Sequence, residues 1–455
     1  MSTRQESYPV RSHQRRHPWE AYEKDLMTEF TQCMDEGKDM EPYRALFDAA
    51  ARLPDSAHKA ALGDVLFDIV EAAPQRDGYP YYEPSDYEDI VAASAAGRGE
   101  GTGGLTVPDD AVRHNKNKGA LYGRICGCLL GKCVEGIRYD ELTRFPKATV
   151  NYPMYRYIAR SDLNKINVSD YGFPLAGRIY PNGPMPGMPV DDDTNYIILA
   201  HILLRDKGRD FTPADVADVW LRYQPKDAYC TAERAAFRNF VDGFLPPDSA
   251  RYKNPYREWI GAQIRGDWFG WCNPADPTAA ASMAWRDACI SHVKNGIYGE
   301  MWVAAMLAAV AGGADIETGI RIGMEHIPTQ SRLHEALMNV LGAFRGGMSA
   351  NAFFEDLHRR WDDRNGHHWC HTVSNAEIVA ASLLWGGGDY AASVGMAVEQ
   401  GFDTDCNGAT VGSVVGMAIG FDAIPAYWTN KISGKLFTSI FGFETVSVDE
   451  LAEKI

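Results

Sequence analysis

The sequence predicts an all-α fold, and two observations carry that prediction. Apolar residues recur at helical spacing along most of the chain, whereas alternating strand patterns are few. Glycines also recur at every fourth position in two segments, 119–131 and 408–420, which places them on one face of a helix. Loops rich in proline, glycine, asparagine and aromatic residues separate the helical segments. We therefore expect a compact bundle of many helices.

The composition indicates a soluble globular protein, with 45% apolar and 23% charged residues. The net charge of −16 argues against general binding to nucleic acid or to anionic membranes, because like charges repel. The nine cysteines form no C-x-x-C pair and the N-terminus has no apolar signal segment, so we expect buried thiols and a cytoplasmic location. The glycine-rich helices carry charged residues, so we expect no membrane span. Nothing in the sequence indicates an oligomeric state.

The chain divides into three expected regions. Residues 1–18 are expected to be a disordered polar tail. Residues 19–108 show helical periodicity and contain a glycine-rich stretch at 97–104, so we expect a helical N-terminal extension and a linker. Residues 109–455 form the expected main domain. Its predicted helices span 119–134, 194–206, 213–222, 278–290, 299–312, 332–345, 373–385, 390–400 and 407–420.

The two glycine registers predict a specific helix pair. Glycine destabilises a helix, so four glycines in register indicate that another backbone approaches closely. We expect the two glycine-faced helices to pack against each other, which would bring acidic residues at their ends together. Ordinary tight packing with solvated acids is the alternative.

Two groups of carboxylates lie at predicted helix starts. Asp191, Asp192 and Asp193 precede an apolar run, and Asp403 and Asp405 precede the second glycine helix. A solvated acidic cap would explain the first group taken alone. Two such groups together favour a site for a hard cation such as Mg²⁺.

Three motifs carry a family resemblance: GRICGCLLGKCVEG at 123–136, DDDT at 191–194 and GFDTDCNGATVGSVVG at 401–416. In this order they resemble the ADP-ribosylglycohydrolase family, including its dinitrogenase-reductase-activating type. The resemblance implies an all-α fold around a centre of two Mg²⁺ ions, with Mn²⁺ as a possible substitute. It matches Asp192 and Asp193 to the family's early acid pair, and Asp403 and Asp405 to its late pair.

The sequence departs from the family pattern at two metal positions. Asp191 replaces the early threonine ligand and adds a carboxylate. Cys406 stands at the late hydroxyl position, and a thiol is a poor ligand for Mg²⁺ unless its backbone carbonyl serves instead. For the family's early glutamate, three residues compete, and Glu135 is favoured over Asp140 and Glu141.

Five further residues are expected to contact substrate. Asn295, Gly296 and Tyr298 resemble the centre of the family's Asn-Gly substrate loop, although a helix-start turn also explains Tyr298. His371 and Asn375 shortly precede the late acid motif, so we expect them in the same cleft. A purely structural role for His371 is the alternative.

The resulting hypothesis is an N-glycosyl hydrolase acting at the anomeric carbon of a ribose, on an ADP-ribosyl or related nucleotide substrate. Glu135, Asp192 and Asp405 are the candidate catalytic residues. One alternative is a glycohydrolase for a small N-ribosylated metabolite, and another is a non-catalytic binding or structural relative. A two-metal phosphoesterase would be expected to use more histidine ligands and to release phosphate.

Overall fold

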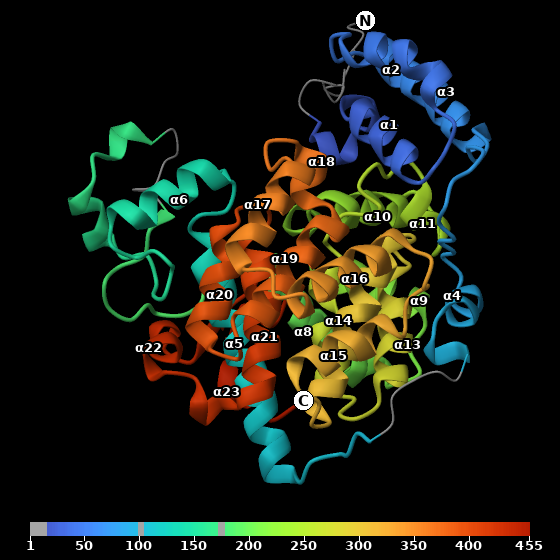
Figure 1. Ribbon diagram of the computed structural model, residues 1–455. Helices are drawn as coiled ribbons and strands as arrows, with labels where there is room; N and C mark the ends of the chain where they lie inside the picture. Colours follow the sequence, from blue (N-terminus) through green and yellow to red (C-terminus); the bar gives the residue numbers. More distant parts are fainter. Residues whose placement is uncertain (1–15, 99–103, 172–177) are drawn as a thin grey trace, which may run out of the picture.

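The computed structural model describes residues 16–98, 104–171 and 178–455 (Figure 1). Within these ranges the regular secondary structure is almost wholly helical, so the all-α prediction is confirmed. The described residues include two short strands, β1 (Lys435–Phe437) and β2 (Thr445–Ser447), which pair antiparallel and which the sequence analysis did not anticipate. The expected tail at 1–18 lies mostly outside the described residues, as does the centre of the expected linker.

The α-helices are, in chain order, α1 (Leu26–Asp35), α2 (Arg44–Ala51), α3 (Ala57–Ala72), α4 (Tyr87–Ala93), α5 (Asp110–Lys132), α6 (Tyr139–Ala148), α8 (Asp192–Lys207), α9 (Pro213–Tyr223), α10 (Thr231–Val241), α11 (Asp248–Arg251), α12 (Asp267–Trp271), α13 (Pro277–Ala288), α14 (Asn295–Ala311), α15 (Ile316–Met324), α16 (Arg332–Arg345), α17 (Ala350–Arg360), α18 (Gly366–Cys370), α19 (Thr372–Trp385), α20 (Tyr390–Glu399), α21 (Thr404–Ile419), α22 (Ala426–Thr429) and α23 (Val448–Ala452). Short 3₁₀ helices connect them, at Pro18–Glu20 (η2), Tyr22–Lys24, Glu41–Tyr43, Ala96–Arg98, Arg160–Lys165, Val168–Asp170, Lys226–Ala228, Gln263–Arg265, Phe421–Ala423 and Asn430–Ile432.

Every helix expected in the main domain is present, and the differences lie at the ends. Helix α5 begins at Asp110, earlier than expected, because Asp109 caps it by accepting a hydrogen bond from the Val112 N–H at 2.9 Å. Helix α9 begins as its sequence suggests, with Pro213 in the first turn and a reciprocal cap between Thr212 and Asp215. The amphipathic helices α6, α10, α15 and α17 were not anticipated.

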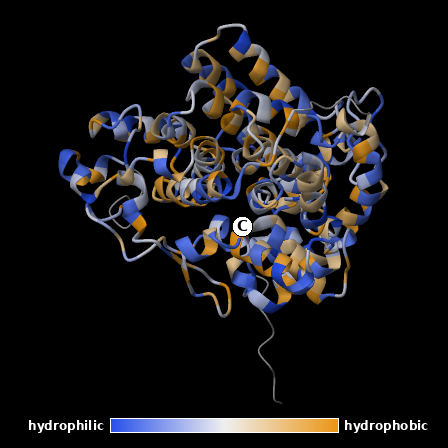
Figure 2. Cartoon of the chain, turned by 90° about the horizontal axis from the view of Figure 1, so that it is seen from below, coloured by the Kyte–Doolittle hydropathy of each residue, from blue (hydrophilic) through white to orange (hydrophobic). Residues whose placement is uncertain are grey.

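Helix α14 is the centre of the core. All of its residues are buried, and the helix packs against α12, α13, α15 and α19. A helix that is apolar on every side must be surrounded by other helices, which explains its place. In Figure 2 the apolar residues gather on the helices in the middle of the molecule, whereas hydrophilic residues are frequent at its rim.

The segment 16–98, which we call the N-terminal extension, has a small core of its own. Its apolar cluster includes Leu26, Phe30, Phe47, Leu66 and Val70 from α1, α2 and α3. Of these helices, α1 contacts α18, and the preceding η2 contacts α10 (Figure 1). The helical character expected for the extension is thus confirmed, while its status as a separate domain stays a prediction.

All nine cysteines are free thiols, and Cys126, Cys128 and Cys133 are buried as expected. Among the described residues, we find no helix with the length and apolar character that crossing a membrane requires.

Candidate active site

Helices α5 and α21 run antiparallel with their backbones in contact. A Cβ atom on Gly127 would lie 2.0 Å from the carbonyl oxygen of Gly408, closer than any real packing allows. At one end of the pair, Thr404 Oγ1 donates a hydrogen bond to the Gly131 carbonyl at 3.0 Å. The C-terminus of α5 therefore lies beside the N-terminus of α21, and the expected pairing of the two glycine faces is confirmed.

A strained turn presents the late acid motif. Gly401 and Phe402 both have positive φ angles, 68° and 56°, and such a conformation is costly for a phenylalanine. Phe402 is buried, and its carbonyl accepts a hydrogen bond from Trp369 Nε1. The turn ends at Asp403, the residue before α21, so Asp403 and Asp405 lie at the positive end of that helix.

The early acid motif lies at the N-terminus of α8. Asp191 caps this helix through a hydrogen bond from the Asp193 N–H to its Oδ1, at 2.9 Å. Its other oxygen, Oδ2, accepts a hydrogen bond from Lys132 Nζ at 2.7 Å. Lys132 is the last residue of α5, so this contact joins the glycine helix pair to α8.

The two motifs share one cavity of about 460 Å³, which we call the acid cavity. Five carboxylates expected from the sequence line it: Glu135, Asp191, Asp192, Asp403 and Asp405. They come from the turn after α5 and from the N-termini of α8 and α21. The other lining residues used below are Trp19, Lys132, Asn195, Cys230, Glu233, Trp259, Ile260, Ile264, Trp369 and Cys406.

The electrostatics of this cluster fit a cation. Burial and the neighbouring carboxylates raise the pKa of Asp192 and of Asp405 well above the usual range. Burial, followed by repulsion from Asp403 and Asp191, raises the pKa of Glu135 to about 7. Asp405 Oδ1 is buried and has no hydrogen-bond partner among the described residues. A hard divalent ion would neutralise these charges and would satisfy the orphan oxygen.

Cys406 lies in the same group, with its Sγ within 4.8 Å of ligand atoms of Asp403 and Asp405. Burial and the nearby carboxylates raise the pKa of this thiol well above its usual range, so it stays protonated. A protonated thiol is a weak ligand for a hard ion, so the carboxylates are the fitting donors.

A family model described as ADP-ribosylglycohydrolase matches residues 109–455. The chain belongs to the ADP-ribosylglycohydrolase family. Membership supports an enzyme of the glycohydrolase type. A solved structure described as an ADP-ribosylglycohydrolase-related protein complex is similar to this chain, with 19% sequence identity, coverage of 76% of this chain and 96% of that chain, and a TM-score of 0.47. No curated protein matches the sequence.

Asp193 was expected to bind metal together with the other acids of its motif, and a carboxylate oxygen of Asp193 lies within 4.8 Å of one of Asp191, but the same carboxylate pairs with a buried arginine. Its Oδ1 accepts a hydrogen bond from Arg124 Nη2 at 2.8 Å, and both side chains are fully buried. Arg124 also pairs with Asp267 at 2.9 Å. The carboxylate of Asp193 does not line the cavity. The sequence could not reveal this, because Arg124 lies 69 residues before Asp193 and no local spacing links the two.

The residues matched to the family's Asn-Gly loop bind the N-terminal extension and lie outside the acid cavity. Asn295 Nδ2 donates to Glu83 Oε1 at 2.8 Å and to Glu258 Oε1 at 2.9 Å, and the Tyr298 hydroxyl donates to the Pro84 carbonyl. A Cβ atom on Gly296 would meet the Arg257 carbonyl at 2.6 Å, so its backbone is covered. The structure therefore places Asn295, Gly296 and Tyr298 outside the lining of the acid cavity, where the substrate was expected.

His371 and Asn375 lie behind the cavity and do not line it. Asn375 Oδ1 accepts hydrogen bonds from the Asp403 N–H at 3.3 Å and from Asn407 Nδ2 at 2.7 Å. Asn375 thereby supports the backbone of the late acid motif. Neither His371 nor Asn375 lines the cavity, which differs from the position expected for residues that contact substrate.

Asp35, His367 and His371 form another group of potential metal ligands. However, His371 Nδ1 accepts a hydrogen bond from the Val373 N–H at 3.1 Å, and His367 Nδ1 accepts one from Trp259 Nε1 at 3.0 Å. A neutral imidazole with an accepting Nδ1 carries its proton on Nε2, so neither Nε2 offers a lone pair. Within this group His367 and Asp35 are hydrogen-bonded to each other, whereas His371 Nε2 is buried without a hydrogen-bond partner among the described residues.

A second cavity, of about 510 Å³, lies between the N-terminal extension and the helices beneath it. Glu36, Arg257, Trp285 and Lys294 are among its lining residues. Its charges pair with one another, since Arg257 and Lys294 both contact Glu36. No residue of the acid motifs is among those that line this second cavity. We therefore assign the candidate active site to the first cavity.

Sequence reasoning missed several residues of the acid cavity. Trp259 belongs to the aromatic-rich segment 250–275, whose side chains could stack on a base but are explained more simply by packing within a loop. Cys230 and Glu233 fall at the start of the unanticipated helix α10. No sequence pattern indicated that Trp19 belongs to the site, because it lies far from both acid motifs in the sequence.

Proposed function

We propose that this protein is a Mg²⁺-dependent hydrolase that cleaves the N-glycosidic bond at the anomeric carbon of a ribose, in an ADP-ribosyl or related nucleotide substrate. The observation that supports this most is the convergence of five carboxylates on one cavity of about 460 Å³. Known ligand pockets span roughly 300–1,000 Å³, so the cavity suits a small molecule or the end of a modified side chain.

Asp191, Asp192, Asp403 and Asp405 are the residues that would hold the metal, as two Mg²⁺ ions in our proposal, with Mn²⁺ as a substitute. Bound Mg²⁺ would act as a Lewis acid toward the ribose hydroxyls and would make a nearby water more acidic. The cap that Asp191 forms at α8 helps to keep that carboxylate in place, and Asp403 and Asp405 lie at the positive end of α21.

Glu135 is our candidate for the proton transfer. It lines the cavity from the turn after α5, and its backbone carbonyl accepts a hydrogen bond from Arg178 Nη1 at 2.7 Å. A carboxylate oxygen there can accept the proton of a water that attacks the anomeric carbon. Positive charge developing on the sugar ring would be stabilised by Asp192 and Asp405.

The test is metal-dependent ligand binding and product analysis. Titration calorimetry with Mg²⁺, with and without ADP-ribose, would compare the wild type with Asp405→Asn. Asp422→Asn is the matched control, since Asp422 is an exposed acid just after the same helix. We expect Asp405→Asn to lose Mg²⁺ binding and Mg²⁺-dependent ADP-ribose binding, and Asp422→Asn to retain both.

Product analysis then separates the reaction classes. Incubation with ADP-ribosyl conjugates and with nucleosides, followed by assays for free reducing sugar and for phosphate, should detect sugar. Phosphate without free sugar would replace the proposal with a phosphoesterase. Mg²⁺ binding that survives in the Asp403→Ala, Asp405→Ala double variant would reject the metal site.

A further inference from the structure

The acid cavity has an aromatic wall that its family motifs do not supply. Trp19, Trp259 and Trp369 line it, and Ile260 and Ile264 add apolar surface. Trp19 is a residue of the N-terminal extension, in η2, and packs with Trp369 on the buried cluster that contains Trp259. The lining of the cavity therefore combines carboxylates with indole rings.

Trp19 is held firmly in this position. The carboxylate of the next residue, Glu20, lies 2.7 Å from Lys226 Nζ and 3.6 Å from Arg234 Nη1. The Arg234 guanidinium carbon lies over the Trp19 ring, 5.1 Å from its centroid, within the range of cation–π attraction. Arg238 also donates a hydrogen bond to the Glu20 carbonyl, at 3.4 Å. The indole is thus a fixed part of the wall.

The N-terminal extension also orients Trp259. Trp259 Nε1 donates to His367 Nδ1 at 3.0 Å, and His367 Nε2 lies 2.9 Å from Asp35 Oδ2 in α1. Since His367 Nδ1 is an acceptor, the ring proton is on Nε2, and Nε2 donates a hydrogen bond to Asp35. Burial opposes ionisation of Asp35, but its hydrogen bond with His367 brings the pKa of Asp35 below the usual range, so the acceptor is a carboxylate.

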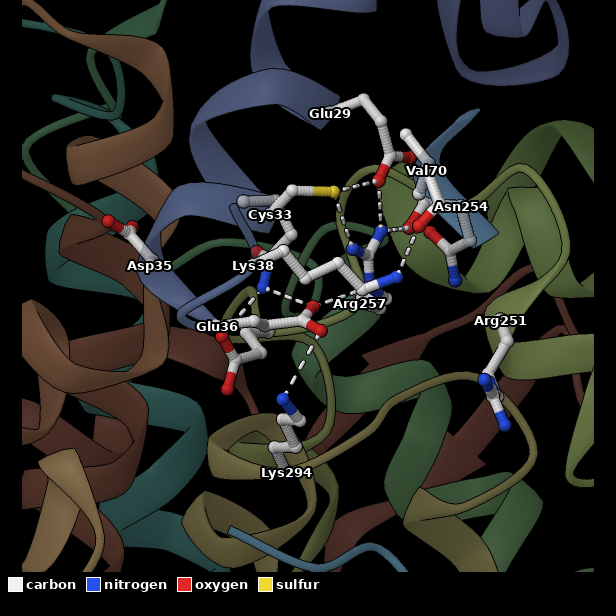
Figure 3. Close-up of polar contacts among 12 residues, drawn as sticks. Glu29, Cys33, Asp35, Glu36, Lys38, Val70, Arg251, Asn254, Arg257 and Lys294 are labelled. Atoms are coloured by element: carbon white, nitrogen blue, oxygen red, sulfur yellow. Dashed lines mark hydrogen bonds and ion pairs between the residues drawn. The ribbon is translucent and has the colours of Figure 1, made fainter. Parts of the chain in front are cut away.

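Buried ion pairs connect α1 and the residue after it, Glu36, to the segment that carries Trp259. Figure 3 shows Arg257 between Glu29 and Glu36, with Arg257 Nη1 at 2.7 Å from Glu29 Oε1 and Arg257 Nε at 2.6 Å from Glu36 Oε1. Lys294 Nζ approaches the other oxygen of Glu36 at 3.4 Å. Arg257 is only two residues before Trp259, so docking of α1 and placement of the aromatic wall are parts of one arrangement.

From these contacts we infer that the N-terminal extension completes the substrate site. Trp19 is a specificity-determining residue that stacks on a planar heteroaromatic ring of the substrate. Asp35 is a positioning residue that acts through His367 on Trp259. This inference rests on the proposed function, which places the ribose against the carboxylates. Indole faces stack on any nucleobase with little regard to its identity. The ring is either the base on the anomeric carbon or the distal base of an ADP-ribosyl group.

The test compares ligands with and without a ring. Titration calorimetry in Mg²⁺ would measure ADP-ribose, adenosine and ribose 5-phosphate on the wild type, Trp19→Ala and Trp19→Phe. We expect Trp19→Ala to weaken ADP-ribose binding by about tenfold or more, and to change ribose 5-phosphate binding by less than about twofold. Trp19→Phe, which keeps a π face, should recover most of the loss.

Trp285→Ala is the matched control. Trp285 also contacts the N-terminal extension, through a hydrogen bond from its Nε1 to the Ser85 carbonyl at 2.9 Å, but it lines the other cavity. We expect the Trp285→Ala variant to bind all three ligands with the affinities of the wild type. Weaker adenosine binding in Trp19→Ala would identify the ring as the one on the anomeric carbon, and a loss confined to ADP-ribose would identify the distal ring.

The positioning role of Asp35 has its own readout. Asp35→Ala should weaken ADP-ribose binding while leaving ribose 5-phosphate binding intact, and Asp35→Asn, which keeps an acceptor for His367, should restore it in part. Equal losses for both ligands, or none, in Trp19→Ala would overturn the stacking role and leave the proposed function standing. A wild type that binds Mg²⁺ but none of the three ligands would overturn both.

Discussion

The backbones of Gly123 and Gly412 touch: a Cβ atom on Gly412 would lie 2.2 Å from the carbonyl oxygen of Gly123. The obstacle is main chain on a rigid helix, which no side-chain rotation can relieve. This contact sets the distance between α5 and α21, and with it the distance between the two ends that carry Lys132 and Asp405. The glycine face is therefore a determinant of site geometry as well as of packing.

Gly412→Ala should lower the free energy of unfolding by about 3 kcal/mol or more, because the two helices must separate. Gly342→Ala is the matched control, since Gly342 lies inside α16 with nothing within 4 Å of an added Cβ. This control should stabilise the protein by about 0.5–1 kcal/mol through helix propensity. Thermal and denaturant unfolding measure both, and equal effects would contradict the role assigned to the α5–α21 contact.

Asp192 and Asp193 are adjacent in sequence but should respond oppositely to neutralisation. Asp192→Asn replaces a buried carboxyl whose ionised form is repelled by its neighbours, so the metal-free protein should gain on the order of 1 kcal/mol in stability while Mg²⁺ affinity falls. Asp193→Asn leaves the buried Arg124 with one carboxylate fewer and should cost about 3 kcal/mol.

Paired unfolding and Mg²⁺ titrations of the two variants check this prediction. A pattern in which Asp193→Asn loses metal affinity and keeps its stability would restore Asp193 as a ligand and would contradict the structural role that its contact with Arg124 indicates.

Lys132 supplies a positive charge inside the acid cavity, where its ammonium contacts Asp191. Lys132→Met should make Mg²⁺ binding tighter by about threefold or more, because the ion no longer competes with an ammonium for Asp191. The metal-free variant should in turn be less stable, since the carboxylates lose their counter-charge. Weaker Mg²⁺ binding would show instead that Lys132 holds Asp191 in its binding geometry.

The sequence sufficed for features that depend on local spacing. The glycine registers predicted the α5–α21 pair, and the acid motifs predicted a shared site, because a helix turn converts such spacings directly into geometry. The hydrogen bond between Asn295 and Glu83 could not be predicted, because Glu83 is 212 residues away and belongs to the N-terminal extension. The same holds for Trp19 and for the buried pair of Arg124 and Asp193. Long-range contacts of this kind leave no periodic trace in a single sequence.

Glu399 provides a pH-dependent contribution to stability that is independent of the candidate site. This buried carboxyl in α20 accepts a hydrogen bond from the Met154 N–H. Burial raises the pKa of Glu399 to about 7, although the Met154 N–H and Lys147 act in the opposite direction. The folded state therefore binds a proton more tightly than the unfolded chain does, whose glutamates titrate near pH 4.5.

The sign of the effect follows from this difference. Below about pH 4.5 the carboxyl is protonated in both states and its contribution is fully present, whereas between about pH 4.5 and 7 the unfolded chain releases its proton first and stability falls as the pH rises. Glu399→Gln keeps the acceptor for Met154 without a charge, so it should gain on the order of 1–3 kcal/mol over the wild type at pH 8 and almost nothing at pH 4. Denaturant unfolding at several pH values measures the difference, and a gain that does not vary with pH would contradict the assignment.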